Sequence, residues 1–262
     1  MTNIYRYDHL ISLGENCHTA CILRDINLRK CAFPFDWSRG NREGICGMTG
    51  FQMKINMILN SFNGCFELEN LLEEDDDPAL KTRCIVNNKT GLQYIHDFPK
   101  NQTKEEHYPA FFEKYIRRAE RLLSVCKQQR VLFVFICHHH NLPLTLVQKA
   151  SSQLRAFFSN PHIDFLIFTH NDNCYPDDFI YHNYQNGIYY FEINNSYFHK
   201  EDIADGGNKP LIRNLINAFY HNSHITFPLV IKLGFYALVK KHDLQYYRLK
   251  QNYYQFPLWR HK

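Results

Sequence analysis

The feature best suited to chemistry is a cysteine placed behind a short strand and a glycine turn. An apolar run over 9–13 predicts a buried strand, and the run stops at Gly14. Asn16 is a favourable N-cap residue, so we expect a helix over 17–25 with Cys17 in its first turn. A thiol there lies near the positive end of the helix dipole, which favours the nucleophilic thiolate. The alternative is a buried cysteine in an ordinary turn.

The same turn offers hydrogen-bond donors for acyl chemistry. Backbone N–H groups at a helix start can stabilise a developing oxyanion, and the Asn16 side-chain amide could add a further donor. Gly14 supplies the tight turn between strand and helix. We therefore assign Gly14 and Asn16 to an oxyanion-binding turn.

Histidines follow two other predicted strands. His138 and His140 come directly after one buried strand, and His170 and Asn171 come after the next. We expect these four residues to line a crevice and to bind a polar or phosphorylated substrate or cofactor. His170 is also one candidate for the general base that would accept the proton of the cysteine. Adjacent residues of an extended chain point to opposite faces, so the Cys-His-His-His run cannot direct all its side chains at one ion. No metal site is predicted.

The elements that must position these residues alternate between strands and helices. The predicted strands are apolar on both faces, and the helices carry apolar residues at helical spacing. This pattern is typical of an α/β fold, a single three-layer domain with a mainly parallel sheet of at least four strands. Because the carboxyl ends of parallel strands meet at one edge, we expect the cysteine turn and the histidines to share a crevice. The strands are expected at 9–13, 130–136, 163–169 and 188–193, and the helices at 17–25, 108–126, 144–158 and 210–220.

Composition narrows the function classes. The chain has 262 residues, 45% of them hydrophobic, and a net charge of +4, which is too small to indicate nucleic-acid binding. It has no apolar run of about eighteen residues and no N-terminal signal segment. Its nine cysteines are scattered, which favours reduced thiols in a cytoplasmic protein. No glycine-rich nucleotide motif is present, so no tightly bound cofactor is expected.

The last part of the chain differs from the rest. Residues 225–262 hold seven lysines and arginines against one acid, together with nine aromatic residues. We expect an α/β domain over 1–224 and a helical basic-aromatic extension over 225–262. This extension either packs on the domain, which we favour, or makes a peripheral contact with anionic lipid at the inner face of the membrane.

Three motifs, in order, resemble a known family. Residues 12–17 read Ser-Leu-Gly-Glu-Asn-Cys, residues 34–37 read Pro-Phe-Asp-Trp, and residues 96–98 read His-Asp-Phe. This order is similar to a bacterial family of unknown function labelled papain-like cysteine peptidases. The resemblance implies a catalytic pair, in which Cys17 is the nucleophile and His96 the base that takes its proton.

A third group should hold the imidazole. Asp97 adjoins His96, and neighbouring side chains of an extended segment diverge, so Asp36 is the expected orienting residue. The alternative role of Asp36 is to cap its own loop. The chain departs from the family in one place, because the Phe-Val-Arg that usually ends the next strand is Phe-Val-Phe over 133–135 here. If that arginine binds an anionic group of the substrate, this chain has lost or replaced it.

The expected chemistry is acyl transfer through a cysteine. The Gly-x-Asn-Cys turn is also similar to the Gly-Asn-Cys turn of capsule-biosynthesis acetyltransferases. We therefore expect first an O-acetyltransferase of a bacterial surface polysaccharide, with acetyl-coenzyme A as the donor substrate and a glycan or lipid-linked glycan as the acceptor. One alternative is a papain-like cysteine peptidase or thiol hydrolase. The other is a non-catalytic protein that binds a sugar or a nucleotide.

Overall fold

A mainly parallel sheet forms the centre of the α/β fold, as the sequence predicts. The computed structural model describes residues 7–40, 49–74, 81–137, 142–175, 178–184, 187–194 and 209–221. In the order of the sheet, the strands are β1 (His9–Ser12), β5 (Val131–Ile136), β6 (Ile163–His170), β8 (Ile188–Ile193) and β7 (Phe179–Tyr184). The first four are parallel, and β7 is antiparallel to β8. Strand β7 is not predicted because this edge strand is too polar to give an apolar run.

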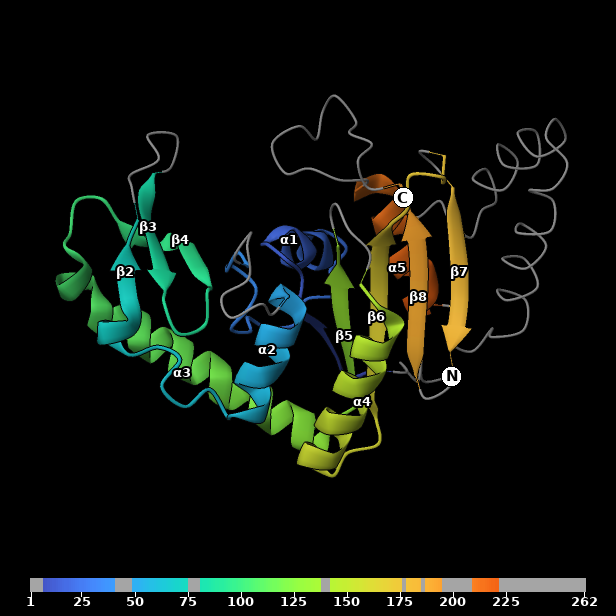
Figure 1. Cartoon of the computed structure of the whole chain (residues 1–262), viewed down its shortest axis with the longest axis horizontal. Coiled ribbons are helices and arrows are strands. Elements are labelled where there is room, and N and C mark those ends of the chain that lie inside the picture. The colour runs from blue at the N-terminus through green and yellow to red at the C-terminus, as the bar shows by residue number, and fades with distance from the viewer. Residues whose placement is uncertain are drawn as a thin grey trace, which may run out of the picture.

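Alternate residues of each strand serve the two faces of the sheet. Phe133 and Phe135 of β5 pack on one face with α2 (Gly50–Leu59), α3 (Lys104–Gln128) and α4 (Leu144–Phe158). Leu132 and Val134 pack on the other face with α1 (His18–Asp25) and α5 (Lys209–His221). The sheet therefore lies between two layers of helices, which is the expected three-layer arrangement (Figure 1).

The structure also has a second, antiparallel sheet, which the sequence does not predict. Strands β2 (Leu71–Glu73), β3 (Thr82–Asn87) and β4 (Gln93–Pro99) pair in that order, after the short 3-10 helix η2 (Leu68–Asn70). This small sheet lies along the first half of α3, apart from the main sheet (Figure 1). Tyr94 and Phe98 of β4 both pack on Phe111 of α3, with ring centroids 4.9 and 4.8 Å apart.

Helix α3 reaches from the small sheet to the main sheet and is longer than predicted. It begins at Lys104 because Thr103 and Glu106 form a capping box, in which Thr103 N–H donates to Glu106 Oε2 at 2.7 Å and Glu106 N–H donates to Thr103 Oγ1 at 3.2 Å. The first turn is polar, so apolar periodicity alone does not reveal it.

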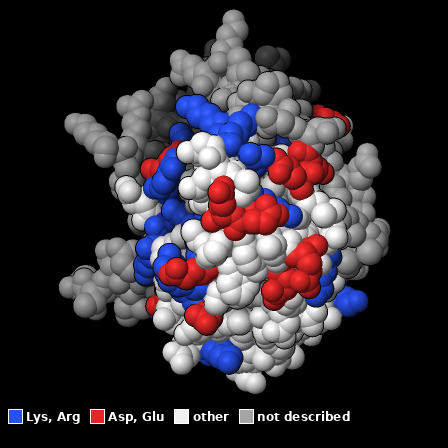
Figure 2. Space-filling view, turned by 90° about the vertical axis from the view of Figure 1, so that its left-hand side faces the viewer, with Lys and Arg blue, Asp and Glu red and all other residues white. Residues whose placement is uncertain are grey.

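Figure 2 looks onto the end of the molecule that carries the small sheet, and acidic and basic side chains are interspersed on this face. Within the small sheet, Arg83 of β3 pairs with Glu73 of β2. No helix in the described part of the chain is long and apolar enough to cross a membrane. The predicted extension at 225–262 lies outside the described residues, so it remains a prediction.

Candidate active site

Cys17 lies at the start of α1, as the sequence predicts, with the cap shifted by one residue. It is the N-cap residue of α1, with φ −63° and ψ −12°. Asn16, the predicted N-cap, stands one residue earlier, and its Oδ1 accepts the His18 N–H at 2.9 Å. The Asn16 side chain thus satisfies one of the first N–H groups of the helix, which fixes its carbonyl oxygen toward the helix start.

Gly14 is required by the close approach of the turn to α1. A Cβ at this position would lie 1.9 Å from Thr19 Oγ1 and 2.7 Å from Thr19 Cβ. Thr19 is itself fully buried. A larger residue at position 14 therefore has to displace the turn or the helix, because the packed interior leaves no space.

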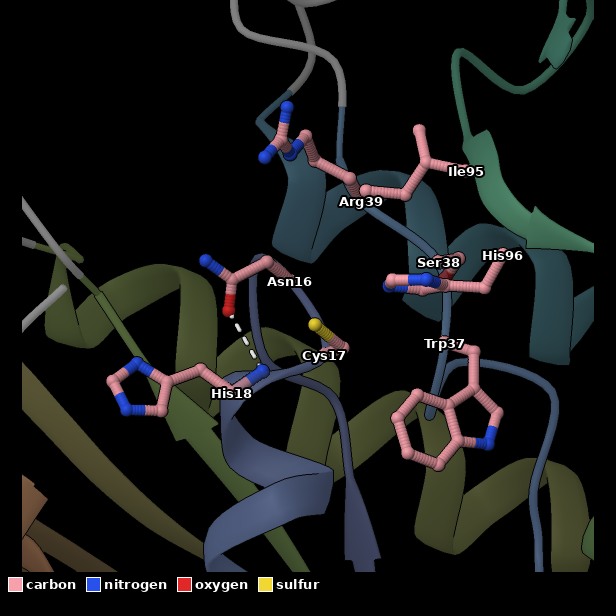
Figure 3. A pocket seen from close by; sticks show the side chains of 8 residues that line it. All are labelled: Asn16, Cys17, His18, Trp37, Ser38, Arg39, Ile95 and His96. Carbon is pink, nitrogen blue, oxygen red and sulfur yellow. Dashed lines mark hydrogen bonds between the residues drawn. The ribbon is translucent and has the colours of Figure 1, made fainter. Parts of the chain in front are cut away.

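Cys17 and His96 line the same pocket although they come from different elements. The His96 side chain is exposed on β4, and Cys17 is half-buried. Figure 3 shows the His96 imidazole extending toward the side of the pocket on which the Cys17 sulfur lies. The pocket holds about 370 Å³ including its open mouth, and its lining residues are Asn16, Cys17, His18, Trp37, Ser38, Arg39, Ile95 and His96.

Backbone hydrogen bonds hold the two sides of this pocket together. Arg39 and Gln93 form an isolated antiparallel bridge, with N–H to oxygen distances of 2.9 and 2.8 Å. The next residue, Gly40, donates its N–H to Glu15 O at 2.6 Å. The segment after the Pro-Phe-Asp-Trp motif is therefore bonded on one side to the strand of the histidine and on the other to the turn of the cysteine.

Trp37 restricts the imidazole. Its ring meets the His96 ring edge-on, with centroids 5.9 Å apart and planes at 84°. The guanidinium carbons of Arg24 and Arg29 lie 5.9 and 5.5 Å from the Trp37 ring centroid. These contacts hold the indole in place, so the indole limits the orientations open to His96.

The carboxylate of Asp36 is engaged by its own loop. Asp36 is buried, and its Oδ2 accepts the Arg29 Nε–H at 2.8 Å and the Phe33 N–H at 2.9 Å. Burial raises the pKa of Asp36, and the Phe33 N–H and the Arg29 charge oppose that rise. Asp36 is not among the pocket-lining residues. These contacts are those of the alternative role, a cap of its own loop, and do not include the imidazole.

Asp97 faces away from the pocket, as expected for a neighbour of His96 on a strand. Its Oδ2 accepts the Tyr115 O–H at 2.8 Å, and its Oδ1 pairs with Lys114. Both partners belong to α3, so Asp97 anchors the histidine strand to that helix.

Two of the other predicted binding residues, His170 and Asn171, do not line this pocket. His170 ends β6, two strands away from β1, and its Nε2 lies 2.8 Å from Asp172 Oδ1. The Asn171 side chain donates to Glu192 Oε2 at 2.5 Å. The Cys17 pocket forms instead against β4 of the small sheet. His138 and His140 lie outside the described residues.

Two further features bear on the sequence predictions. Within the described ranges, no group of three or more His, Cys, Asp or Glu side chains is placed to hold a metal ion, and the eight cysteines there form no disulfide. At the strand position where the resembled family usually has arginine, Phe135 is buried and packs edge-on against Phe51 at 5.1 Å.

An α/β fold that brings a helix-start cysteine and a histidine into one pocket defines a candidate cysteine enzyme. The chain belongs to the family described as "Putative papain-like cysteine peptidase (DUF1796)", whose model matches residues 8–172. The resemblance of the three motifs to this family is thereby confirmed. The matched region contains Cys17, Asp36 and His96.

The chain is also similar to a viral protein. The chain is 30% identical, over an alignment 178 residues long, to an uncharacterized protein of Acanthamoeba polyphaga mimivirus; the alignment covers 62% of this chain and 77% of the viral protein. No solved structure matches the chain. The family description supports a cysteine enzyme and favours the peptidase alternative over the acetyltransferase.

Proposed function

We propose that the chain is a cysteine hydrolase, in which Cys17 attacks a carbonyl carbon and His96 accepts and returns the proton. The observation that carries the proposal is that both side chains line one pocket. The position of Cys17 at a helix start favours its thiolate, because the helix dipole stabilises negative charge there. The family description names the same type of nucleophile.

The first half of the reaction forms a thioester. The thiol proton of Cys17 moves to the His96 imidazole, and the thiolate attacks the substrate carbonyl to form a tetrahedral intermediate. When the intermediate collapses, the carbon–nitrogen or carbon–oxygen bond breaks, and the imidazolium gives its proton to the leaving group. The His18 N–H is bonded to Asn16 Oδ1, so the proposed oxyanion donors are the other N–H groups of the first turn and the Asn16 side-chain amide.

The second half releases the product. Neutral His96 takes a proton from water, and the resulting hydroxide attacks the thioester carbonyl. Collapse of this second intermediate breaks the carbon–sulfur bond and returns the proton to Cys17, so the enzyme is restored and a carboxylic acid leaves. Trp37 supports both halves, because its edge-on contact limits rotation of the His96 ring.

The test is formation of the acyl-enzyme. Wild-type protein incubated with p-nitrophenyl acetate should gain one acetyl group on Cys17, seen by peptide mapping, whereas Cys17→Ala should not. His96→Ala should slow the acylation by about 10²- to 10⁴-fold. Cys21→Ser is the matched control, since Cys21 is also half-buried on α1. Unchanged acylation in Cys17→Ala, or loss in His170→Ala but not in His96→Ala, contradicts the proposal.

The acyl acceptor separates hydrolysis from transfer. An O-acetyltransferase shares the acylation step and passes the acetyl group to a sugar hydroxyl instead of water. The open mouth of the pocket and the Trp37 ring offer a surface for such an acceptor. Incubation with acetyl-coenzyme A, with and without a glycan, decides between the two: a glycan-dependent loss of the Cys17 thioester favours transfer, and a glycan-independent loss favours hydrolysis.

A lipid-linked acceptor would bring the protein to a membrane through residues 225–262. Seven cationic side chains in this extension favour anionic lipid by roughly 1 kcal/mol each near the surface. Sedimentation with anionic vesicles should then weaken as salt rises, since salt shortens the Debye length. Equal sedimentation with neutral and anionic vesicles at low salt contradicts this part of the proposal.

A further inference from the structure

A lysine lies buried beneath the turn that carries the nucleophile. Lys54 of α2 is fully buried, and its Nζ donates to the carbonyl oxygen of Gly14 and lies 3.5 Å from that of Leu13. The ammonium also lies 5.5 Å from the ring centroid of Phe35. None of the three sequence motifs includes this residue, and the proposed reaction steps do not use it.

Keeping an ammonium group in this place costs stability. Removal from water disfavours the charged form, and burial lowers the pKa of Lys54 to about 8. The carboxylates of Glu15, on the cysteine turn, and Asp36, on the loop after Phe35, face the ammonium and oppose this shift. An apolar side chain of similar length would fill the same space without desolvating a charge. Packing alone therefore does not explain why this position holds a lysine, and we look for a role of its charge.

The contacts of Lys54 determine how the turn is oriented. A trans peptide holds its C=O and N–H in opposite directions. Because the Leu13 and Gly14 carbonyls point at Lys54, the N–H groups of Gly14 and Glu15 point away from it. Thr19 packs where a Cβ of Gly14 would stand, so the turn also lies close to α1.

We propose that Lys54 is a positioning residue for the nucleophile: its ammonium holds the carbonyls of the Leu13–Gly14 turn and adds a positive charge beneath the turn that leads to Cys17. This inference rests on the proposed function, in which Cys17 is the nucleophile. Lys54 acts through the turn and does not touch the substrate, because it is fully buried and lies outside the pocket lining.

The experiment measures the alkylation rate of Cys17 by iodoacetamide at pH 7 in Lys54→Met. We expect the rate to fall about tenfold, the effect of one pKa unit on the thiolate fraction. The midpoint of thermal unfolding should stay the same or rise, since a buried charge is removed. A purely structural lysine gives the reverse pattern, with a lower midpoint and an unchanged rate, and that result overturns the proposal.

Lys104→Met is the matched control. Lys104 also donates from its ammonium to a backbone carbonyl, Leu71 O at 2.7 Å, but on the small sheet. Its replacement should leave the Cys17 rate unchanged. Cys126, which is fully buried, reports on the fold, because it becomes reactive only when the core opens. A tenfold fall in the Lys104→Met rate overturns the assignment to Lys54.

If Cys126 becomes reactive in Lys54→Met, the core of that variant has opened, and a second experiment that keeps Lys54 is needed. The alkylation rate of Cys17 is then measured from about pH 6 to about pH 10 in His96→Ala, which removes the nearby imidazole. Lys54 loses its proton in this range, and Glu15 and Asp36 are the carboxylates that face it. Coupling of the two groups broadens the rise in rate beyond a single ionisation. A single-ionisation curve overturns the proposal.

These measurements distinguish a failure of the Lys54 proposal from a failure of the hydrolase proposal. Alkylation of Cys17 needs no turnover, so it tests Lys54 whatever the substrate is. Full activity in Cys17→Ala disproves the hydrolase mechanism. An inactive Cys17→Ala beside a Lys54→Met that is alkylated at the wild-type rate disproves only the role of Lys54.

Discussion

Replacing Gly14 with alanine tests whether the turn must approach α1 as closely as the structure shows. The added Cβ would stand 1.9 Å from Thr19 Oγ1, so the two groups must separate by at least about 1.5 Å, shared between the turn and the helix, to reach ordinary contact. Thr19 is buried and cannot swing into solvent. We expect Gly14→Ala to lower the free energy of unfolding by about 1–3 kcal/mol, the usual cost of overpacking.

The same displacement is expected to move Cys17, the proposed nucleophile. Cys17 lies between Gly14 and Thr19 in the chain, so a shift of the turn by about 1 Å moves the sulfur relative to His96 and is expected to lower kcat by about 10²-fold. Urea unfolding gives the stability, and release of p-nitrophenol from the ester gives kcat.

A double-mutant cycle locates the cause. Thr19→Ala removes Oγ1, which is the nearer of the two clashing atoms, but leaves its Cβ at 2.7 Å from the new methyl group. Combining Gly14→Ala with Thr19→Ala should therefore recover part of the stability and of kcat, and the coupling energy should be favourable. Wild-type stability and activity in Gly14→Ala alone would refute the reasoning, as would strict additivity of the two changes.

Three further predictions follow from contacts around the pocket. Trp37→Leu removes the ring edge that limits His96, so kcat should fall by about 10- to 10²-fold while circular dichroism stays unchanged; an unaltered kcat contradicts the orienting role. In the wild type, iodoacetamide should label Cys17 before Cys126, because burial strongly raises the pKa of the Cys126 thiol and closes it to reagent; peptide mapping after a brief exposure decides this. Because burial lowers the pKa of Lys54 from 10.5 to about 8, the unfolded chain binds that proton more tightly than the folded chain. Between about pH 8 and about pH 10.5, the unfolding free energy of the wild type should therefore rise by up to about 3 kcal/mol relative to that of Lys54→Met. Urea titrations measure the difference between the two proteins, and a difference that does not change with pH contradicts this prediction.

The main sheet could be predicted because its strands bury both faces. All six residues of β5 are buried, and such a strand appears in the sequence as an unbroken apolar run. The small sheet gives no such signal. In β4 the exposed His96 interrupts buried residues, and β2 buries only Leu71 of its three residues. These strands owe their stability to pairing with one another and to packing on α3, which the sequence pattern does not display.

Motifs in the sequence indicate Cys17 and His96 as the candidate catalytic residues, but no motif indicates the contacts that join the two sides of their pocket. Arg39 pairs with Gln93, and Gly40 with Glu15, entirely through backbone groups. Any residue except proline offers the same N–H and C=O, so no side-chain pattern marks such a bridge. Asp36 shows the converse difficulty: a carboxylate in a motif is equally suited to an imidazole or to an arginine, and only the fold reveals that Arg29 is its partner.

The contacts of Asp36 and Asp97 raise the question of whether a cysteine and a histidine can work without a carboxylate. Among the described residues, no carboxylate is hydrogen-bonded to His96, whereas Trp37 meets the ring edge-on. A serine hydroxyl is a weak acid and needs a strongly oriented base. A thiol ionises near pH 8.5 and lower at a helix start, so much less driving force must come from the imidazole and its support. An aromatic ring that limits rotation is then sufficient to keep the base facing the nucleophile. On this argument, removing Trp37 harms the pair more than neutralising Asp36, whose charge serves Arg29 and its own loop.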